Sequence, residues 1–165
     1  MRAIEYQGAG GTEVVAETER PLPVPGPGEV LVKVAAFGLN RADVQQRIGV
    51  YPPPPGASDI PGLEVSGIVE AVGPEADASL AGKRVCALLA GGGYAQYVAV
   101  PEGHVLELPD SVDLVDAAGF MEVAATVVDP EIPVLTIEDL GVLRSVEEDG
   151  ERVRVDLTPT YSGCP

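Results

Sequence analysis

Short valine-rich runs, separated by glycine and proline, constrain the fold of this chain more than any other feature of its sequence. The 165 residues include 20 glycines and 16 prolines, two phenylalanines and no tryptophan. Glycine and proline favour turns and interrupt regular elements, so this composition predicts many short segments. We therefore expect a mainly β fold and exclude an all-helical one.

Six runs have the length and composition of β-strands. They are residues 2–6, 13–16, 29–36, 65–72, 84–89 and 94–100. Residues 40–47 are the clearest helix candidate, because Asn40 is a suitable N-cap and Asp43 lies in the first turn. The regular spacing of the strands predicts a small barrel or sandwich with short helices.

The charge and cysteine content exclude several classes of protein. Twenty-six acidic and ten basic residues give a net charge of −16, which repels nucleic acid and anionic membrane surfaces. No apolar run approaches the roughly 20 residues of a spanning helix. Two cysteines cannot build a disulfide framework, and no signal peptide is visible. We expect a cytoplasmic protein that binds neither nucleic acid nor membranes.

The sequence changes in character after Pro109. Residues 110–118 have the pattern of an acidic helix start, and residues 121–128 predict a second helix that must end before Pro130. An acidic turn at residues 147–150 precedes the alternating run 152–157. Turn and alternation together predict a β-hairpin.

Residues 38–73 carry a long and specific motif. The segment begins Gly-Leu-Asn-Arg-Ala-Asp-Val and continues through Tyr-Pro-Pro-Pro-Pro-Gly to Gly-Leu-Glu-Val-Ser-Gly. It closely resembles the quinone oxidoreductase branch of the medium-chain dehydrogenase/reductase superfamily, and the resemblance extends over residues 1–126. It implies a partly open GroES-like β-barrel that forms one wall of a cleft. NADPH, bound by a second domain, would deliver a hydride to a quinone or enone in this cleft.

The same resemblance argues against zinc. Asn40 and Gly62-Leu63-Glu64 stand where zinc-using relatives carry a cysteine and Gly-His-Glu. An amide and a leucine cannot replace a thiolate and an imidazole around tetrahedral zinc. We therefore expect no metal, and we expect the single histidine, His104, to lie in a surface loop. Cys86 is expected to be a small buried apolar residue.

Two residues are implied to bind the cofactor. Asn40 and Tyr51 match family positions on the nicotinamide and substrate side of the cleft, where an amide and a phenol can hydrogen-bond a carbonyl or a carboxamide. In the alternative interpretation, Asn40 only caps the helix and Tyr51 packs on the prolines. Arg41, Gln45 and Arg47 are weaker candidates. We assign no catalytic residue, because the family mainly places two substrates against each other.

The glycine motif of a dinucleotide-binding domain is missing from these residues. No Gly-x-Gly-x-x-Gly is present, and Gly91–Gly93 lies between two predicted strands and not before a helix. The expectation is that NADPH binding is weak or absent in this chain, and that it is inactive as a reductase by itself.

The last forty residues resemble another family. Residues 129–143 and 157–165 are similar to the MIP18-type iron-sulphur assembly family, and most similar to the branch of that family associated with phenylacetyl-CoA epoxidase. The resemblance implies a truncated α/β fragment and an iron-sulphur or oxygenase partner. The motif cysteine corresponds to Cys164, which is a candidate reactive thiol. In the alternative interpretation, Cys164 is an exposed terminal thiol, because the helix that follows this cysteine in the family is missing here.

The two resemblances meet near residues 120–128. We therefore expect a GroES-like domain at residues 1–126, an iron-sulphur assembly fragment at residues 127–165, and a chimeric reading frame. Three functions stay open at this stage. The chain is a quinone oxidoreductase by family, an accessory protein for an iron-containing oxygenase, or a product without stable function whose unpaired barrel edge pairs with other chains.

Overall fold

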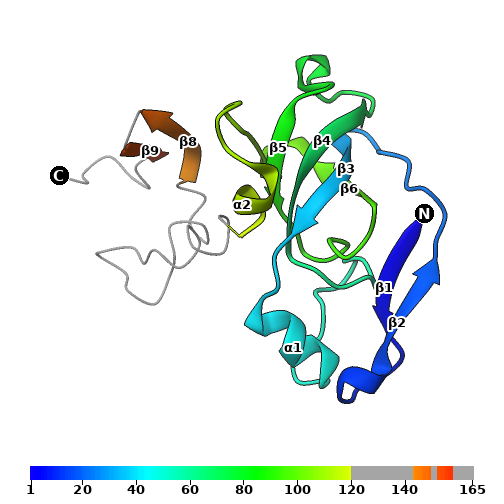
Figure 1. The fold of residues 1–165 in the computed structure, drawn as a ribbon. Coiled ribbons are helices and arrows are strands. Elements are labelled where there is room, and N and C mark those ends of the chain that lie inside the picture. The colour runs from blue at the N-terminus through cyan, green and yellow to red at the C-terminus, as the bar shows by residue number, and fades with distance from the viewer. Residues whose placement is uncertain (120–142, 150–151, 158–165) are drawn as a thin grey trace, which may run out of the picture.

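The computed structural model describes residues 1–119, 143–149 and 152–157. Figure 1 shows a β-rich body with short helices at its periphery. The elements, in chain order, are β1 (Arg2–Tyr6), η1 (Thr12–Val14), β2 (Val15–Glu19), β3 (Glu29–Phe37), α1 (Arg41–Arg47), β4 (Glu64–Val72), η2 (Ala78–Leu80), β5 (Arg84–Leu88), β6 (Tyr97–Pro101), η3 (Glu102–His104), β7 (Val105–Glu107), α2 (Leu114–Ala118), β8 (Leu143–Asp149) and β9 (Arg152–Leu157).

The main sheet has five antiparallel strands in the order β6-β3-β4-β5-β7. Alternate side chains of these strands form a buried core of branched aliphatic residues, which suit a pleated sheet. The core residues are Val30, Val32, Val65, Val69, Val85, Ala87, Leu89, Val98 and Val100. Burial of each valine contributes about 1.5 kcal/mol or more to stability.

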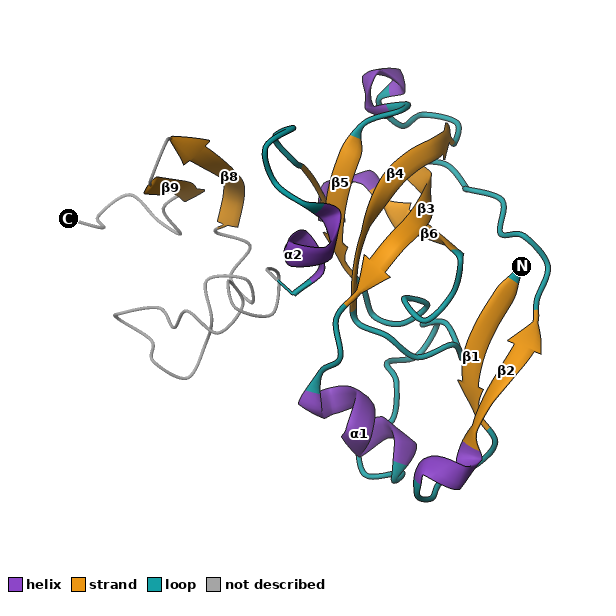
Figure 2. Cartoon of the chain, viewed as in Figure 1, coloured by secondary structure: helices purple, strands orange, loops and turns teal. Residues whose placement is uncertain are grey.

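Helix α2 covers another part of the main sheet (Figure 2). Ala117 and Cys86 are buried against each other, with Leu106 and Leu108 packed around them. Ser66, buried in β4, donates a hydrogen bond to the carbonyl oxygen of Leu114. This bond accounts for a hydroxyl that would otherwise be buried without a partner.

Strands β1 and β2 form a separate two-stranded ribbon. The segment before β6 joins this ribbon to the rest of the molecule. Ile4 N–H donates to the carbonyl of Tyr94 at 2.8 Å, and Gln96 N–H donates to that of Arg2 at 3.1 Å. The open, mainly β architecture confirms the GroES-like barrel expected from the sequence. No helix in the described part of the chain is long and apolar enough to cross a membrane.

The structure corrects the prediction of strands among residues 1–107 in three places. The strand predicted at residues 13–16 is wrong at its start, because Glu13 binds the backbone N–H of Gly11 at 2.7 Å and η1 forms there. The strand predicted at 94–100 begins only at Tyr97, since Tyr94 N–H is bonded to the Pro61 carbonyl. Strand β7 was not predicted, because three residues carry too short a pattern.

Strands β8 and β9 pair in antiparallel fashion, which confirms the predicted hairpin. Strand β8 continues to Asp149, so residues 147–149 of the predicted turn belong to the strand. The helix predicted at residues 110–118 begins at Leu114, after its N-cap Asp113. The helix predicted at residues 121–128 and the candidate thiol Cys164 lie outside the described residues.

Candidate functional site

Asn40 occupies the N-cap of α1, as the sequence predicted. Its backbone is extended, with φ −103° and ψ 156°, and its N–H donates to Asp43 Oδ2 at 2.7 Å. Asp43 lies one turn into the helix, so this bond is the carboxylate half of a capping box. The start of α1 is thereby fixed, and with it the position of the Asn40 side chain.

The Asn40 amide points to a buried acid. Nδ2 of Asn40 donates to Glu64 Oε1 at 3.0 Å, and Glu64, at the start of β4, is 1% exposed. Gly38 makes room for this carboxylate, because a Cβ at that position would overlap with Oε1. The connection joins α1 to the central strand of the sheet.

A second buried contact fixes Asp43. Its carboxylate is 3% exposed, and Oδ2 accepts a hydrogen bond from the Tyr94 hydroxyl at 2.7 Å. The other oxygen, Oδ1, is buried without a hydrogen-bond partner. Burial, followed by the bond to Asp43, raises the pKa of Tyr94 well above its usual range, so this hydroxyl stays protonated. Tyr94 is therefore a permanent donor to Asp43.

Gly62 and Phe37 hold the ring of Tyr94 in place. Gly62 has φ +101° and would place a Cβ against the ring and backbone of Tyr94, so a side chain cannot be accommodated there. Tyr94 also stacks obliquely on Phe37, with ring centroids 4.6 Å apart. We refer to Asn40, Asp43, Glu64 and Tyr94 as the Asn40 network.

Tyr51 lies at the other end of α1 from Asn40. Its backbone N–H donates to the carbonyl of Gln45 at 3.3 Å, and its side chain is exposed. Arg41 is exposed at the first turn, whereas Arg47 donates to the carbonyl of Gly10 at 2.8 Å. Arg47 is therefore engaged with the loop after β1. The structure joins Asn40 and Tyr51 through α1 and shows no direct contact between their side chains.

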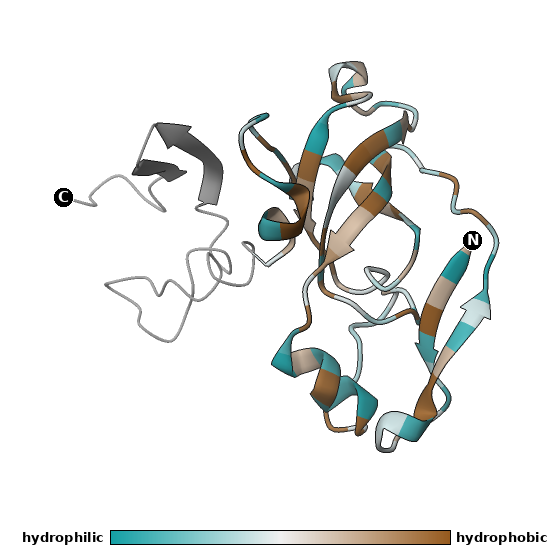
Figure 3. Cartoon of the chain, viewed as in Figure 1, coloured by the Kyte–Doolittle hydropathy of each residue, from teal (hydrophilic) through white to brown (hydrophobic). Residues whose placement is uncertain are grey.

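Several large apolar side chains close to these residues in the chain are exposed. Leu39, which precedes Asn40, is 78% exposed, and Val50, which precedes Tyr51, is 67% exposed. Val44 and Ile48 are also exposed, and their spacing places them on one side of α1. Figure 3 shows hydrophobic segments, in brown, on α1. A group of exposed apolar side chains favours the binding of a ligand or another domain.

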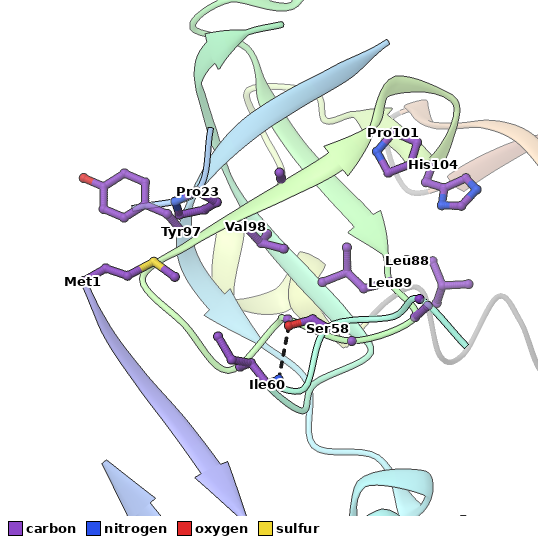
Figure 4. A pocket seen from close by; sticks show the side chains of 15 residues that line it. Met1, Pro23, Ser58, Ile60, Leu88, Leu89, Tyr97, Val98, Pro101 and His104 are labelled. Atoms are coloured by element: carbon purple, nitrogen blue, oxygen red, sulfur yellow. Dashed lines mark hydrogen bonds between the residues drawn. The ribbon is translucent and has the colours of Figure 1, made fainter. Parts of the chain in front are cut away.

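Two cavities of the described residues lie apart from Asn40 and Tyr51. One, of about 370 Å³, lies beside β6 and is lined mainly by apolar side chains such as Ile60, Leu89 and Val98 (Figure 4). The other, of about 280 Å³, is lined in part by Phe37 and Tyr94. Asn40 and Tyr51 line neither cavity. The candidate site is therefore an open surface, with the smaller cavity next to Tyr94.

Asn40 and Leu63 stand where zinc-using relatives carry metal ligands, and their side chains do not suit tetrahedral zinc. The Asn40 amide nitrogen is a donor to Glu64, and Leu63 offers no ligand atom. Within residues 1–119 and the β8–β9 hairpin, no group of three or more histidine, cysteine or acidic side chains could hold an ion. His104 is exposed in η3, as predicted for a surface position.

Gly91–Gly93 forms the connection between β5 and β6, as expected for a turn of the barrel. Gly92 N–H donates to the carbonyl of Ile60 at 2.6 Å, and Gly91 and Gly92 have φ values of +154° and +100°. These glycines thus bring the segment before β6 against the residues before β4. They position Tyr94 and are not followed by a helix.

Cys86 is the buried apolar residue that the sequence predicted. It is 1% exposed, and burial raises the pKa of its thiol to about 12. Because the thiolate is the reacting form, we expect Cys86 in a Cys164→Ser variant to react with a thiol reagent at least about 100-fold more slowly in native buffer than in urea. Equal rates, with circular dichroism showing a folded protein, would contradict the buried position.

Comparison with known families agrees with this fold. Residues 26–110 match the alcohol dehydrogenase GroES-like domain, and residues 121–165 match the iron-sulfur cluster assembly protein family. The first match covers more than half of the chain. The chain therefore belongs to the alcohol dehydrogenase GroES-like domain family, and it carries a second match at its C-terminal end.

Individual relatives include quinone oxidoreductases and homologs of the synaptic vesicle membrane protein VAT-1. Quinone oxidoreductase of Lama guanicoe is 38% identical over 115 residues, which cover 68% of this chain and 35% of the relative. The human synaptic vesicle membrane protein VAT-1 homolog-like protein superposes with a TM-score of 0.72 at 35% identity, covering 76% of this chain and 41% of that one.

Escherichia coli quinone oxidoreductase, solved with NADPH, superposes with a TM-score of 0.67 at 32% identity, covering 72% of this chain and 36% of that enzyme. The chain thus spans about a third of the length of the curated relatives that it matches.

Sequence reasoning missed Tyr94 and the role of Glu64 in the Asn40 network. The sequence pattern places Tyr94 in a strand, and it marks Glu64 only as part of the position where relatives bind zinc. The signal for Glu64 was an acidic residue directly before the valine-rich run 65–72. Such a residue at the start of a buried strand needs a partner.

Proposed function

We propose that residues 1–119 provide the substrate side of a zinc-independent, NADPH-dependent quinone oxidoreductase that reduces a quinone or enone. The observation that carries the proposal is the Asn40 amide, held by Glu64 next to an exposed apolar surface. A nicotinamide or quinone ring is flat and apolar and carries polar oxygen or carboxamide groups. A fixed amide beside apolar side chains suits such a ring.

In this mechanism NADPH supplies the hydride. Asn40 and Tyr51 hydrogen-bond polar groups of the cofactor or substrate, and the exposed apolar side chains around α1 exclude water from the reacting rings. Asp43 and Tyr94 keep the N-terminus of α1 in place. The residues of this chain contribute orientation and no proton transfer, which is sufficient for a hydride transfer between two positioned substrates.

The proposal includes the division of the chain at residue 126 and its origin as a chimera of two families. The NADPH-binding wall would come from a cofactor domain that has no counterpart in the sequence patterns of residues 1–165. Cytoplasmic location is part of the same proposal, since two cysteines cannot build a disulfide framework and suit a reducing compartment.

Isothermal titration of the full chain with NADPH, together with an assay of NADPH oxidation in the presence of 1,4-benzoquinone, tests this division of labour. We expect no saturable binding at micromolar NADPH and at most a trace of oxidation. Micromolar affinity would show that this chain binds the cofactor without a further domain.

A second function is supported by the match of residues 121–165 to the iron-sulfur cluster assembly protein family. We propose as the alternative that this segment docks on an iron-sulphur or oxygenase partner through Cys164. Capture of the phenylacetyl-CoA epoxidase complex by the full chain, lost in Cys164→Ser, would favour this accessory role. Capture that is equal for both proteins, or absent for both, would count against it.

A further inference from the structure

Glu64 is a buried acid that holds the Asn40 amide and contacts no substrate or cofactor in the proposed mechanism. It is 1% exposed, although an ionised carboxylate is costly to bury and needs compensating hydrogen bonds. One of these comes from Nδ2 of Asn40 at 3.0 Å. The acid therefore faces the side chain that the proposed function places in the cleft.

The chemistry of the two groups permits one orientation of the Asn40 amide. A carboxylate oxygen is only an acceptor, whereas the two ends of an asparagine amide are a donor and an acceptor. Rotation of the amide by 180° would place Oδ1 of Asn40 against Oε1 of Glu64, two acceptors at hydrogen-bond distance. Glu64 disfavours that rotamer, and the hydrogen bond to its charge strengthens the observed one.

Two further features hold the acid and the amide at this distance. Gly38 leaves the space that the Glu64 carboxylate fills, since a Cβ there would overlap with it. The backbone of Asn40 is fixed separately, through Asp43 and the Tyr94 hydroxyl. Backbone and side chain of Asn40 are thus restrained by two different buried carboxylates.

We infer that Glu64 is a positioning residue, which fixes the amide of Asn40 in one orientation before any ligand binds. The value of that orientation for catalysis rests on the proposed function, whereas the orientation itself does not. Preorganisation of this kind means that a ligand meets a fixed pattern of donor and acceptor, without the cost of ordering the side chain.

Asn40 is the only asparagine in the sequence, so labelling with ¹⁵N-asparagine makes a single side-chain NH₂ group, with its two protons, visible in the full chain. In the wild-type protein, without NADPH or quinone, we expect one Nδ2 proton to be shifted downfield and to exchange with solvent about tenfold or more slowly than in free asparagine. Exchange of both protons at the free rate would overturn the inference, whatever the variants do.

Glu64→Gln keeps the size of the side chain and removes its charge. We expect the downfield shift to decrease in this variant, because an uncharged amide oxygen accepts a weaker hydrogen bond than a carboxylate. Glu70→Gln, the same change at an exposed position of β4, should leave the signal in place. Unfolding in urea shows whether Glu64→Gln is folded. An unchanged Asn40 signal in a folded Glu64→Gln variant would also overturn the inference. Because no ligand is present, the result is independent of whether the chain is a reductase.

Discussion

Replacement of Tyr94 by phenylalanine is expected to lower the free energy of unfolding by about 2 kcal/mol. The substitution removes the hydroxyl that donates to Asp43 at 2.7 Å and leaves the ring and its contact with Phe37 in place. Asp43 already has one buried oxygen without a partner. Asp43 is 3% exposed, and without the Tyr94 hydroxyl its carboxylate keeps only the hydrogen bond from the Asn40 N–H, which explains the size of the effect.

Urea denaturation followed by circular dichroism measures this loss. Tyr97→Phe is the matched control, because it removes the same atom from a half-buried side chain at the edge of the larger cavity. We expect the control to change stability by about 0.5 kcal/mol or less. Equal effects of the two substitutions would show that the contact with Asp43 contributes nothing specific.

Gly67→Ala is expected to have the largest effect on stability, a loss of about 3 kcal/mol. Gly67 pairs with Val34 in the centre of the sheet, and a Cβ at this position would overlap with the carbonyl oxygen of Lys33. Because that oxygen belongs to the backbone of the neighbouring strand β3, it cannot move without disturbing the sheet.

Gly103→Ala tests whether this loss comes from the contact and not from the alanine itself. A Cβ on Gly103 would meet no atom within 4 Å, so we expect a change of at most about 0.5 kcal/mol. The comparison is made by thermal and urea unfolding of both variants. A Gly67→Ala protein as stable as the wild type would contradict the close approach of β3 and β4.

Local patterns predicted the strands and α1, because their information lies within a few residues. Valine alternation identified β3, β4 and β5 almost to the residue, and Asn40 with Asp43 marked the start of α1. The pattern failed where a local contact competed with it. Glu13 turns back onto Gly11, and a 3-10 turn replaces the start of a predicted strand.

The candidate site was only half visible in the sequence, because its other half depends on distant residues. Asn40 was found by resemblance, whereas the bond between Asp43 and Tyr94 joins positions 51 residues apart. No periodicity relates two such positions. Only the folded sheet shows that the segment after Gly93 lies against the residues before β4, and that it brings a tyrosine to a buried carboxylate.

A domain exchange tests the central proposal most directly. Residues 1–119 replace the corresponding domain of Escherichia coli quinone oxidoreductase, and quinone-dependent oxidation of NADPH is measured. We expect the exchanged enzyme to oxidise NADPH in the presence of a quinone. Asn40→Ala should lower this activity at least about tenfold. His104→Ala, a substitution in the exposed η3 turn, should leave it unchanged. An exchanged enzyme that binds NADPH as tightly as its parent, but oxidises none with any quinone or enone, would contradict the proposal.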